Sequence, residues 1–428
     1  MKKFYIWTIG CQMNKSDSER LGWKLEDLGY EQVQSAEKAD MIILNSCVVR
    51  QSAEDKVVNK LSNLKALKRD HPEKTLVLAG CMVGPRIEEL RDRFPYVDLF
   101  LRPQQFDALL EYIGASTSHI SILLPHSPSP TTYIPIIRGC NNFCSFCIVP
   151  YRRGRENSRP VSEIVTEAEK LAEQGVKEVT LLGQNVDSYG HDLPNRPTLA
   201  NLLRELNQID SLARIRFLTS HPKDMTYDLI DAVASLDKVC EHINLPTQTG
   251  DNNILKAMRR GYTIERYMDL INHMLATIPG VALSTDVIVG FPGETGEQFQ
   301  RTFDILEQVR FDTVHVAAYS PRPGTIASRK LEDDVPVEEK QRRLQAIDEL
   351  QEKVSSEKNS QLLGDVVEVL VEGRKGEKWR GRTRTDKPVF FESDEDCFGE
   401  LVEVKIEHAG PWSLQGRPVS TSLATNRS

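Results

Sequence analysis

The sequence predicts an α/β protein of three parts: an open parallel α/β sheet, a partial (β/α)6 barrel and a small all-β barrel. Two observations predict this class. Short apolar runs alternate with helical stretches over most of the chain, which is typical of βαβ units and a parallel sheet. Beyond Gln361 the pattern changes to strand-like runs separated by glycines, which is typical of a small β-barrel.

Length and composition narrow the class further. The chain has 428 residues, which favours about three domains, and 39% hydrophobic residues, which are enough to form folded cores. No apolar run approaches the ~20 residues of a membrane-spanning helix, and the apolar stretch after Met1 is too short for a secretory signal. The net charge of −8 excludes a general attraction to nucleic acid, so affinity for RNA has to come from local basic patches.

The eight cysteines favour metal binding or catalysis over disulfides. A chain of this size with no export signal is expected in the reducing cytoplasm, where disulfides are rare. Cys240 and Cys397 fit no ligand pattern, and such free cysteines are usually buried packing residues. The other six form two sets of three.

Residues 1–115 are expected to form the N-terminal α/β domain. Cys11, Cys47 and Cys81 each follow a short apolar run, at residues 4–10, 39–46 and 75–80, and helical stretches lie at residues 16–29 and 51–69. Cysteines just past the carboxyl ends of neighbouring parallel strands can converge on one crevice. The three are therefore candidate ligands of one metal centre. By spacing alone, three buried strand-end cysteines are a fair alternative.

The central domain is expected at residues 126–358, behind a Pro- and Ser-rich linker at residues 115–132. Six strands are predicted, at residues 133–138, 177–182, 214–219, 242–245, 282–289 and 313–318. Helical patterns lie between most of them, at residues 162–174, 264–277 and 297–309. Six βα units are fewer than the eight of a closed TIM barrel, so we expect an open, partial barrel.

The end of the chain combines a helix with a β-barrel. The charged, heptad-like residues 337–358 predict one exposed helix that bridges to the last domain. That domain is expected at residues 361–424, with strands at residues 366–371 and 401–406.

The most specific local signal is the run Gly-Cys-Asn-Asn-Phe-Cys-Ser-Phe-Cys at residues 139–147. Cys140, Cys144 and Cys147 have the spacing C-x3-C-x2-C directly after a predicted strand. Three soft thiolates on one loop suit an iron–sulfur cluster and leave its fourth iron open. A structural zinc site normally closes with four ligands, and no fourth Cys or His lies nearby in the sequence.

These motifs resemble those of the methylthiotransferases of the radical S-adenosylmethionine (SAM) superfamily, and among them the MiaB type. The last part of the chain resembles a TRAM RNA-binding domain. Besides the three-cysteine loop, the resemblance rests on residues 10–14 (GCQMN), 45–50 (NSCVVR), 79–81 (AGC), 147–155 (CIVPYRRGR), 158–160 (SRP), 181–186 (LLGQNV) and 286–295 (DVIVGFPGET).

The resemblance implies a transferase that methylthiolates carbon two of N6-dimethylallyladenosine next to the anticodon of tRNA. It implies two 4Fe-4S clusters, one held by Cys140, Cys144 and Cys147 and one by Cys11, Cys47 and Cys81. SAM would supply the methyl group and a 5′-deoxyadenosyl radical, because the carbon–hydrogen bond of an adenine ring has no acidic proton for a general base. Both open irons then have to face one water-poor cavity, which we expect below the small barrel.

Three residues are candidate SAM contacts, and no residue is assigned as an acid or base catalyst. Gln184 and Asn185 follow the second predicted strand, at the carboxyl end where barrel active sites lie. Asp286 lies on a strand that the resemblance places near SAM. A capped turn explains Gln184 and Asn185 equally well.

Two basic patches favour contact with RNA, which the resemblance implies to be the anticodon stem-loop of tRNA. Residues 138–159 contain five Arg and one Glu, and residues 374–387 contain seven basic and two acidic residues together with Trp379. A basic hairpin with an aromatic ring suits phosphate contact and base stacking, but a solvated charged hairpin is a common alternative. The other expected partner is an electron donor such as flavodoxin or ferredoxin, and we expect the chain to act as a monomer.

Two alternative functions stay open. A methylthiotransferase of the same fold can act on threonylcarbamoyl-adenosine in tRNA or on an aspartate of a ribosomal protein. A non-catalytic iron–sulfur protein that binds RNA would use its clusters as structural staples. Cleavage of SAM separates the enzyme from the staple, and nucleoside mass spectrometry separates the substrates.

Overall fold

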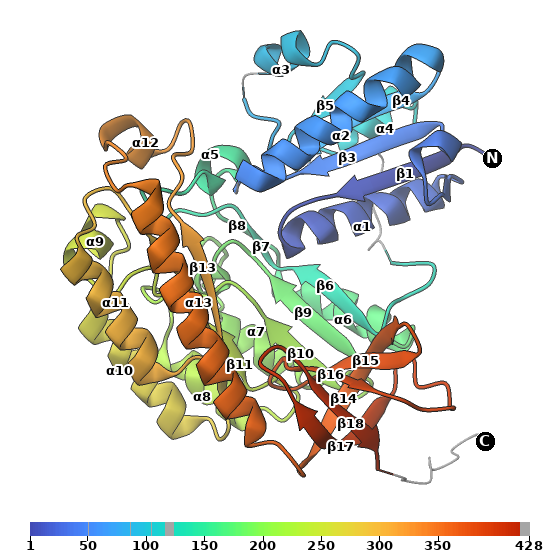
Figure 1. The fold of residues 1–428 in the computed structure, drawn as a ribbon. Coiled ribbons are helices and arrows are strands. Elements are labelled where there is room, and N and C mark those ends of the chain that lie inside the picture. Colours follow the sequence, from blue (N-terminus) through green and yellow to red (C-terminus); the bar gives the residue numbers. More distant parts are fainter. Residues whose placement is uncertain (50, 86, 104, 116–123, 420–428) are drawn as a thin grey trace.

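The predicted α/β class and its three parts are confirmed by a computed structural model that describes residues 1–49, 51–85, 87–103, 105–115 and 124–419 (Figure 1). In Figure 1 the N-terminal sheet lies above the central strands and the small barrel lies below them. Residues 116–123 of the expected linker, Arg50 and residues 420–424 lie outside the described residues. No helix within the described ranges is long and apolar enough to cross a membrane.

The N-terminal part is a parallel sheet of five strands in the order β2-β1-β3-β4-β5. Its strands are β1 (Lys3–Thr8), β2 (Glu31–Gln32), β3 (Met41–Ser46), β4 (Thr75–Gly80) and β5 (Leu99–Leu101). Its helices are α1 (Gln12–Asp27), η1 (Ala36–Lys38), α2 (Gln51–Asp70), α3 (Glu88–Arg93) and α4 (Asp107–Tyr112). Leu61 of α2 packs on one face of the sheet, and Leu21 of α1 and Leu109 of α4 pack on the other. Because both faces are covered, every residue of β3 and all but the first residue of β4 are buried.

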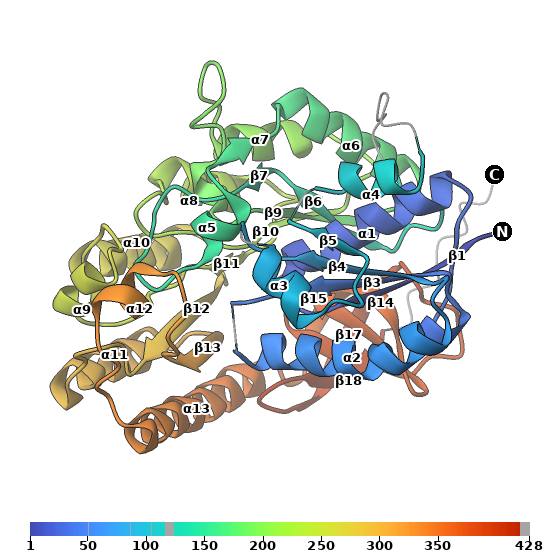
Figure 2. The same cartoon turned by 90° about the horizontal axis from the view of Figure 1, so that it is seen from above.

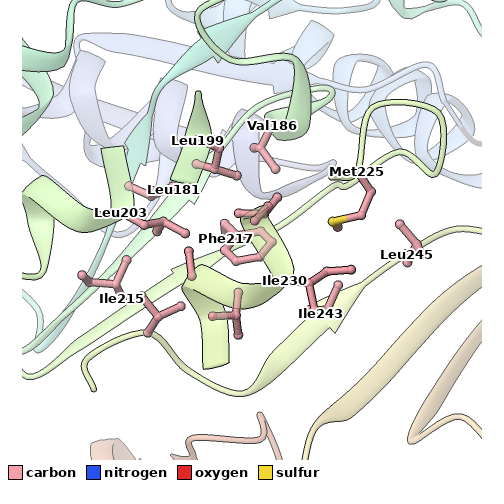
Figure 3. Packing of buried hydrophobic residues seen from close by; sticks show 14 of the residues in the cluster. Leu181, Val186, Leu199, Leu203, Ile215, Phe217, Met225, Ile230, Ile243 and Leu245 are labelled. Atoms are coloured by element: carbon pink, nitrogen blue, oxygen red, sulfur yellow. The ribbon is translucent and has the colours of Figure 1, made fainter. Parts of the chain in front are cut away.

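The six predicted strands of the central part form two three-stranded parallel sheets, β6-β9-β10 and β11-β12-β13. A parallel bridge between Ile215 and Val239 links them into one open barrel. The strands are β6 (Thr131–Pro135), β9 (Glu178–Leu182), β10 (Arg214–Phe217), β11 (His242–Asn244), β12 (Ala282–Val289) and β13 (Thr313–Ala318). Side chains such as Phe217, Ile243 and Leu203 fill the core between strands and outer helices (Figure 3).

The helices of the central part lie mostly between its strands. They are α5 (Val149–Arg153), α6 (Val161–Glu173), η2 (Val186–Ser188), α7 (Leu199–Leu206), α8 (Tyr227–Ser235), α9 (Asn252–Ala257), α10 (Ile264–Thr277), α11 (Gly296–Val309), α12 (Ile326–Lys330) and α13 (Val337–Ser360). Seen from above (Figure 2), the N-terminal sheet lies over this part, and α1 packs against β6.

The predicted strand at residues 133–138 is split at Ile136, and the split creates the loop that carries three of the cysteines. Its second piece, β7 (Ile137–Arg138), pairs antiparallel with β8 (Asn157–Ser158). The two ends of the intervening segment are therefore held side by side. We call residues 139–147 of this segment the cluster loop.

The prediction of an exposed helix at residues 337–358 is wrong, because one face of α13 is buried against β13 and α11. Charged and polar side chains on that face have internal partners. Arg343 pairs with Glu294 at 2.6 Å, and Gln351 donates to the carbonyl oxygen of Phe311 at 3.2 Å. Polar side chains can be buried when they have partners, but those partners lie elsewhere in the chain. The sequence of the helix alone therefore cannot distinguish this buried polar face from one that faces solvent.

The small barrel is closed, with strand order β14-β15-β16-β18-β17. Its strands are β14 (Val366–Lys375), β15 (Lys378–Thr383), β16 (Pro388–Phe391), β17 (Leu401–Ala409) and β18 (Leu414–Pro418). Trp379, Phe391 and Val404 are buried in its centre. Trp379 is only 4% exposed, so the expected base stacking on this ring is wrong.

The small barrel docks at the amino ends of the central strands. Arg214, the first residue of β10, donates to the carbonyl oxygen of Arg382 at 2.9 Å. Arg216 donates to the carbonyl oxygens of Thr383 and Arg384 at 2.6 and 2.7 Å. The cluster loop lies at the opposite, carboxyl ends, so the expected cavity below the small barrel is wrong.

Much of the second basic patch serves this docking. Arg384 pairs with Glu241 at 2.7 Å and Lys387 pairs with Asp312 at 3.0 Å, both across the interface. Three basic residues of the β14–β15 hairpin stay exposed: Arg374, Lys375 and Arg380. The predicted RNA contact of this patch is therefore limited to the hairpin, because the other charges already have protein partners.

Replacement of Arg216 by methionine is expected to loosen this interface. Arg216 is buried and also donates to Glu178 at 2.9 Å. Its removal takes the shortest cationic contact from this buried carboxylate, whose remaining partners Arg382 and Arg214 lie 3.8 and 4.0 Å away, and removes a donor from two carbonyl oxygens. Such a loss costs about 3–5 kcal/mol. Hydrogen exchange should accelerate across β14–β18, and urea unfolding should begin earlier. Arg204→Met, which breaks an exposed pair with Asp228, should cost less than about 1 kcal/mol. Equal effects of the two substitutions would contradict this account.

Candidate metal centres

Three of the predicted ligands lie at the carboxyl ends of neighbouring strands of the N-terminal sheet. Cys11 precedes α1 and is exposed, whereas Cys47 follows β3, Cys81 follows β4, and both are buried. Burial raises the pKa of Cys81 to about 11, and the charges of Cys47 and Cys11 act in the same direction. The three thiols are thus near enough to interact electrostatically, although they are far apart in sequence.

Two asparagines fix the backbone around these thiols. The Asn14 side-chain amide donates to Asn45 Oδ1 at 3.1 Å and to the carbonyl oxygen of Ser46 at 3.0 Å. Asn45 Nδ2 donates in return to the carbonyl oxygen of Asn14 at 2.9 Å. The Cys11 thiol donates to Asn14 Oδ1 at 3.2 Å. Sequence reasoning missed this role, although both asparagines stand beside cysteines in the quoted motifs.

The cluster loop brings the other three predicted ligands together. Cys144 is buried, and Cys140 and Cys147 are half-buried. Burial raises the pKa of Cys140 to about 11 and that of Cys147 to about 12, and the charge of Cys144 raises both further. Phe146 of the loop packs against an apolar cluster that contains Met258. The loop is therefore anchored between its cysteines.

Arg260 is a buried cation beside this loop. Its Nη1 donates to Cys144 Sγ at 3.4 Å, and its Nη2 donates to the carbonyl oxygen of Pro246 at 3.2 Å. Sequence reasoning missed Arg260, because nothing in the local pattern distinguishes it from a surface arginine.

A second buried arginine links the segment after the cluster loop to the N-terminal part. Arg153 ends α5, just after the cluster loop, and pairs with Asp17 of α1 at 2.9 Å with both side chains almost fully buried. The guanidinium also lies near enough to Cys81 and Cys11 to interact with their charges. The N-terminal thiols therefore face the same side of the central strands as the cluster loop.

The donor chemistry of both sets fits an iron–sulfur cluster. Among the residues that the structure describes, no three His, Cys, Asp or Glu side chains are grouped to hold a single metal ion. A cluster is larger than one ion and keeps its thiolate ligands further apart, and metal binding deprotonates thiols whose pKa is raised in its absence. Arg153 and Arg260 each place a positive charge beside one set, which offsets the negative charge of thiolate ligands.

The three candidate SAM contacts differ in their partners. Gln184 Oε1 accepts a hydrogen bond from the backbone N–H of Gly139 at 2.6 Å and so supports the cluster loop. Asn185 Nδ2 donates to Asp224 at 2.7 Å, while its buried Oδ1 has no hydrogen-bond partner. Asp286 accepts from Asn244 Nδ2 at 3.2 Å. Asn185 therefore retains one buried polar atom for a ligand.

A buried polar network borders Asn185. Asp187 accepts hydrogen bonds from Ser220 Oγ and from the backbone N–H of His221, each at 2.9 Å. Burial raises the pKa of Asp187 to about 7 and lowers that of His221 to about 2, so the imidazole is neutral. His221 Nε2 is buried and has no partner among the described residues. His221 therefore retains an unpaired ring nitrogen in this network.

Replacement of Gly139 by alanine is expected to displace the cluster loop. Gly139 has a φ of +76°, and a Cβ there would lie 2.0 Å from the backbone oxygen of Arg155. Gly154 has a φ of +83°, but no atom lies within 4 Å of its Cβ position. Both substitutions strain the backbone, and Gly139→Ala should cost about 1–3 kcal/mol more because of the clash. Thermal unfolding measures the difference. Equal stability of the two variants would show that the loop yields freely.

Family models match all three parts of the chain. Residues 134–306 match the radical SAM superfamily, residues 3–102 match the uncharacterized protein family UPF0004, and residues 360–419 match the TRAM domain. Among solved structures, the radical SAM methyltransferase TsrM from Kitasatospora setae has a TM-score of 0.57 at 16% identity, over 77% of each chain. The cobalamin-dependent radical enzyme OxsB has a TM-score of 0.53 at 12% identity, over 82% of this chain and 56% of its own. At these sequence identities, the similarity to the two solved structures shows a shared fold and nothing more.

Curated relatives match almost the entire chain. A tRNA-2-methylthio-N(6)-dimethylallyladenosine synthase from Dehalococcoides mccartyi is 51% identical over 98% of this chain and 99% of its own length. Proteins of the same name are 50% identical in a Roseiflexus species, over 97% and 89%, and 44% identical in Thermoanaerobacter pseudethanolicus, over 97% and 92%. The chain therefore belongs to the tRNA-2-methylthio-N(6)-dimethylallyladenosine synthase family of the radical SAM superfamily.

Proposed function

We propose that the chain methylthiolates carbon two of N6-dimethylallyladenosine next to the anticodon of tRNA, with SAM as methyl donor and radical source. The observation that carries this proposal is the presence of two three-cysteine sets on one side of the central strands, where the pair of Arg153 and Asp17 links α5 to α1. Family membership supports the same reaction.

Each set of thiols would hold one 4Fe-4S cluster. Cys140, Cys144 and Cys147 would hold the cluster that binds SAM, and Cys11, Cys47 and Cys81 would hold the other. When bound, the first cluster supplies an electron for cleavage of SAM and the second carries the sulfur that is inserted. Three protein ligands apiece would leave one iron of each cluster free for these tasks.

The surrounding residues position the groups and exclude water. Arg260 orients Cys144 through its hydrogen bond to Sγ, and Gln184 holds the start of the cluster loop through Gly139. Gln184, Asn185 and Asp286 are our proposed SAM-binding residues, and Asn185 has the unpaired oxygen that such a contact needs. Asn185 and Arg260 are buried, which suits a radical reaction that water would otherwise intercept.

The remaining assignments follow from this reaction. We assign residues 1–115, 126–358 and 361–424 to an N-terminal methylthiotransferase domain, a radical SAM core and a TRAM-like RNA-binding barrel. The RNA substrate is the anticodon stem-loop, which the exposed tip of the β14–β15 hairpin can contact through Arg374 and Lys375. The reaction requires an electron donor such as flavodoxin or ferredoxin, and we assign the protein to the cytoplasm as a monomer.

The test is nucleoside mass spectrometry on tRNA incubated with the reconstituted chain, SAM and a reductant. One pool carries N6-dimethylallyladenosine without the methylthio group, and the other carries threonylcarbamoyl-adenosine. We expect the methylthio group on the first pool alone. A product only on the second pool would transfer the assignment to the other tRNA substrate. SAM cleavage without any RNA product would favour a protein substrate, and absence of SAM cleavage would favour a structural role of the clusters.

A further inference from the structure

An arginine-lined cavity of about 400 Å³ lies next to the cluster loop. It is lined by Arg138, Arg153, Arg155, Asn157 and Arg159. Arg138 belongs to β7 and Asn157 to β8, so the short ladder that closes the cluster-loop segment also builds the cavity wall. No carboxylate is among the lining residues.

Two of these arginines have buried N–H groups without an acceptor. Arg153 is 8% exposed, and while its Nη1 pairs with Asp17, its Nη2 has no hydrogen-bond partner. Arg138 Nε is likewise buried and unpartnered, and Arg138 forms none of the ion pairs found among the described residues. A buried donor that is left unpaired is costly, so each such group in a native structure needs an explanation, and an ion or ligand that accepts from it is one.

The carboxylates around the cavity already have partners, in part the lining arginines themselves, since Asp17 pairs with Arg153. Glu167 is shared between Arg159, at 2.7 Å, and Arg20. Glu163 lies 3.8 Å from the same Arg159, and Glu156 accepts hydrogen bonds from Asn141. Among the described residues Arg138 and Arg155 form no ion pair, although the charge of Asp17 acts on Arg138 from further away.

The lining side chains differ in their exposure to solvent. Arg155 and Asn157 are exposed, Arg138 and Arg159 are half-buried, and Arg153 is buried. The Arg155 guanidinium lies over the ring of Phe143 at 4.4 Å, which fixes it at the entrance. An anion attached to a longer chain can therefore enter from the surface and reach Arg153 at the base.

We propose that this cavity binds a backbone phosphate of the RNA substrate next to the nucleotide that is modified. The proposal rests on the proposed function, which brings that nucleotide to the cluster loop. Guanidinium groups bind phosphate through paired N–H donors, and several of them around one group are typical of phosphate recognition. Because the β7–β8 ladder connects the cavity to the cluster loop, a phosphate held here fixes the position of its own nucleotide relative to the six thiols.

The test combines two arginine substitutions with single-phosphate changes in the RNA. The probe is a synthetic RNA hairpin with N6-dimethylallyladenosine next to the anticodon, and a series of hairpins with one neutral methylphosphonate each. We expect Arg138→Gln combined with Arg155→Gln to weaken hairpin binding about tenfold or more, as loss of charge-assisted hydrogen bonds does. The salt dependence should also become shallower, with a slope smaller by roughly 0.7 per lost phosphate contact.

The methylphosphonate series identifies the phosphate. For the wild-type protein, one methylphosphonate beside the modified nucleotide should weaken binding strongly. For the double variant, the same methylphosphonate should have little further effect, because the contact is already lost. Arg204→Gln, which removes an exposed arginine paired with Asp228, is the matched control and should leave both affinities near those of the wild type.

Each other outcome overturns the proposal in a recognisable way. If the double variant binds the hairpin as tightly as the wild type, the cavity makes no phosphate contact. The same conclusion follows if the methylphosphonate effects add to the arginine effects at every position. If affinity for SAM falls while hairpin affinity stays, the cavity binds the SAM carboxylate instead. If the wild type and the variants bind and modify the hairpin equally well, only the role of the cavity is refuted. A wild-type protein that does neither refutes the proposed function as well.

Discussion

Replacement of Cys144 by alanine is expected to abolish reductive cleavage of SAM. Cys144 is the most buried thiol of the cluster loop and the one that accepts a hydrogen bond from Arg260. Its loss leaves two ligands for the cluster that binds SAM. Removing a group that merely supports a metal ligand already costs 10–100-fold, so removal of a ligand should lower cleavage by more than about 100-fold. Formation of 5′-deoxyadenosine under anaerobic reduction measures this.

Cys397→Ala is the matched control for this experiment. Cys397 and Cys144 are both 7% exposed, so the two substitutions delete similarly buried thiols. Cys397 lies in the core of the small barrel, away from the cluster loop. Its variant should cleave SAM at close to the wild-type rate. Undiminished cleavage by Cys144→Ala would remove this cysteine from the proposed cluster.

Replacement of Cys47 by alanine should separate the two activities of the protein. Cys47 lies at the end of β3 in the other set of thiols, beside Cys81, and is not part of the cluster loop. We expect cleavage of SAM to persist within a few-fold, while the methylthiolated nucleoside falls below detection. The reason is that cleavage needs only the first cluster, whereas sulfur insertion needs both. Parallel assays of 5′-deoxyadenosine and of modified nucleoside give the ratio.

Cys240→Ala controls for deletion of a buried thiol, since Cys240 is 1% exposed and belongs to neither set. This variant should form both products in wild-type amounts, although the protein is expected to be less stable. If Cys47→Ala still formed the methylthiolated nucleoside at the wild-type rate, the N-terminal set would have no part in sulfur insertion. If it lost both activities while remaining folded, the two clusters would not act separately.

The sequence predicts the central strands well because each βα unit carries its own apolar periodicity. The strands at residues 282–289 and 313–318 and the helix at residues 264–277 have the predicted bounds. The start of α1 is less well predicted, since the helix begins at Gln12 rather than residue 16. The first turn lacks the apolar periodicity that predicts a helix, because Asn14 and Asp17 contact Cys11 and Arg153 instead of an apolar core.

Contacts between the three parts of the chain cannot be predicted from local sequence patterns. The basic run at residues 374–387 predicts RNA contact, yet Arg384 and Lys387 pair with Glu241 and Asp312 of the central part. Those carboxylates are more than 70 residues away in sequence, and nothing in a linear pattern pairs them with the barrel. Arg153 is a related case: the sequence places it in a basic patch, and only the packing of α1 against the central part reveals its pair with Asp17.

The central claim is that two sets of three thiols hold two separate clusters, and iron content tests it most directly. After anaerobic reconstitution, two cubes of four irons give about eight irons per chain. A triple variant with alanine at positions 11, 47 and 81 should retain about four irons and still cleave SAM. A wild-type chain that binds only about four irons, or a triple variant that keeps about eight, would contradict the account.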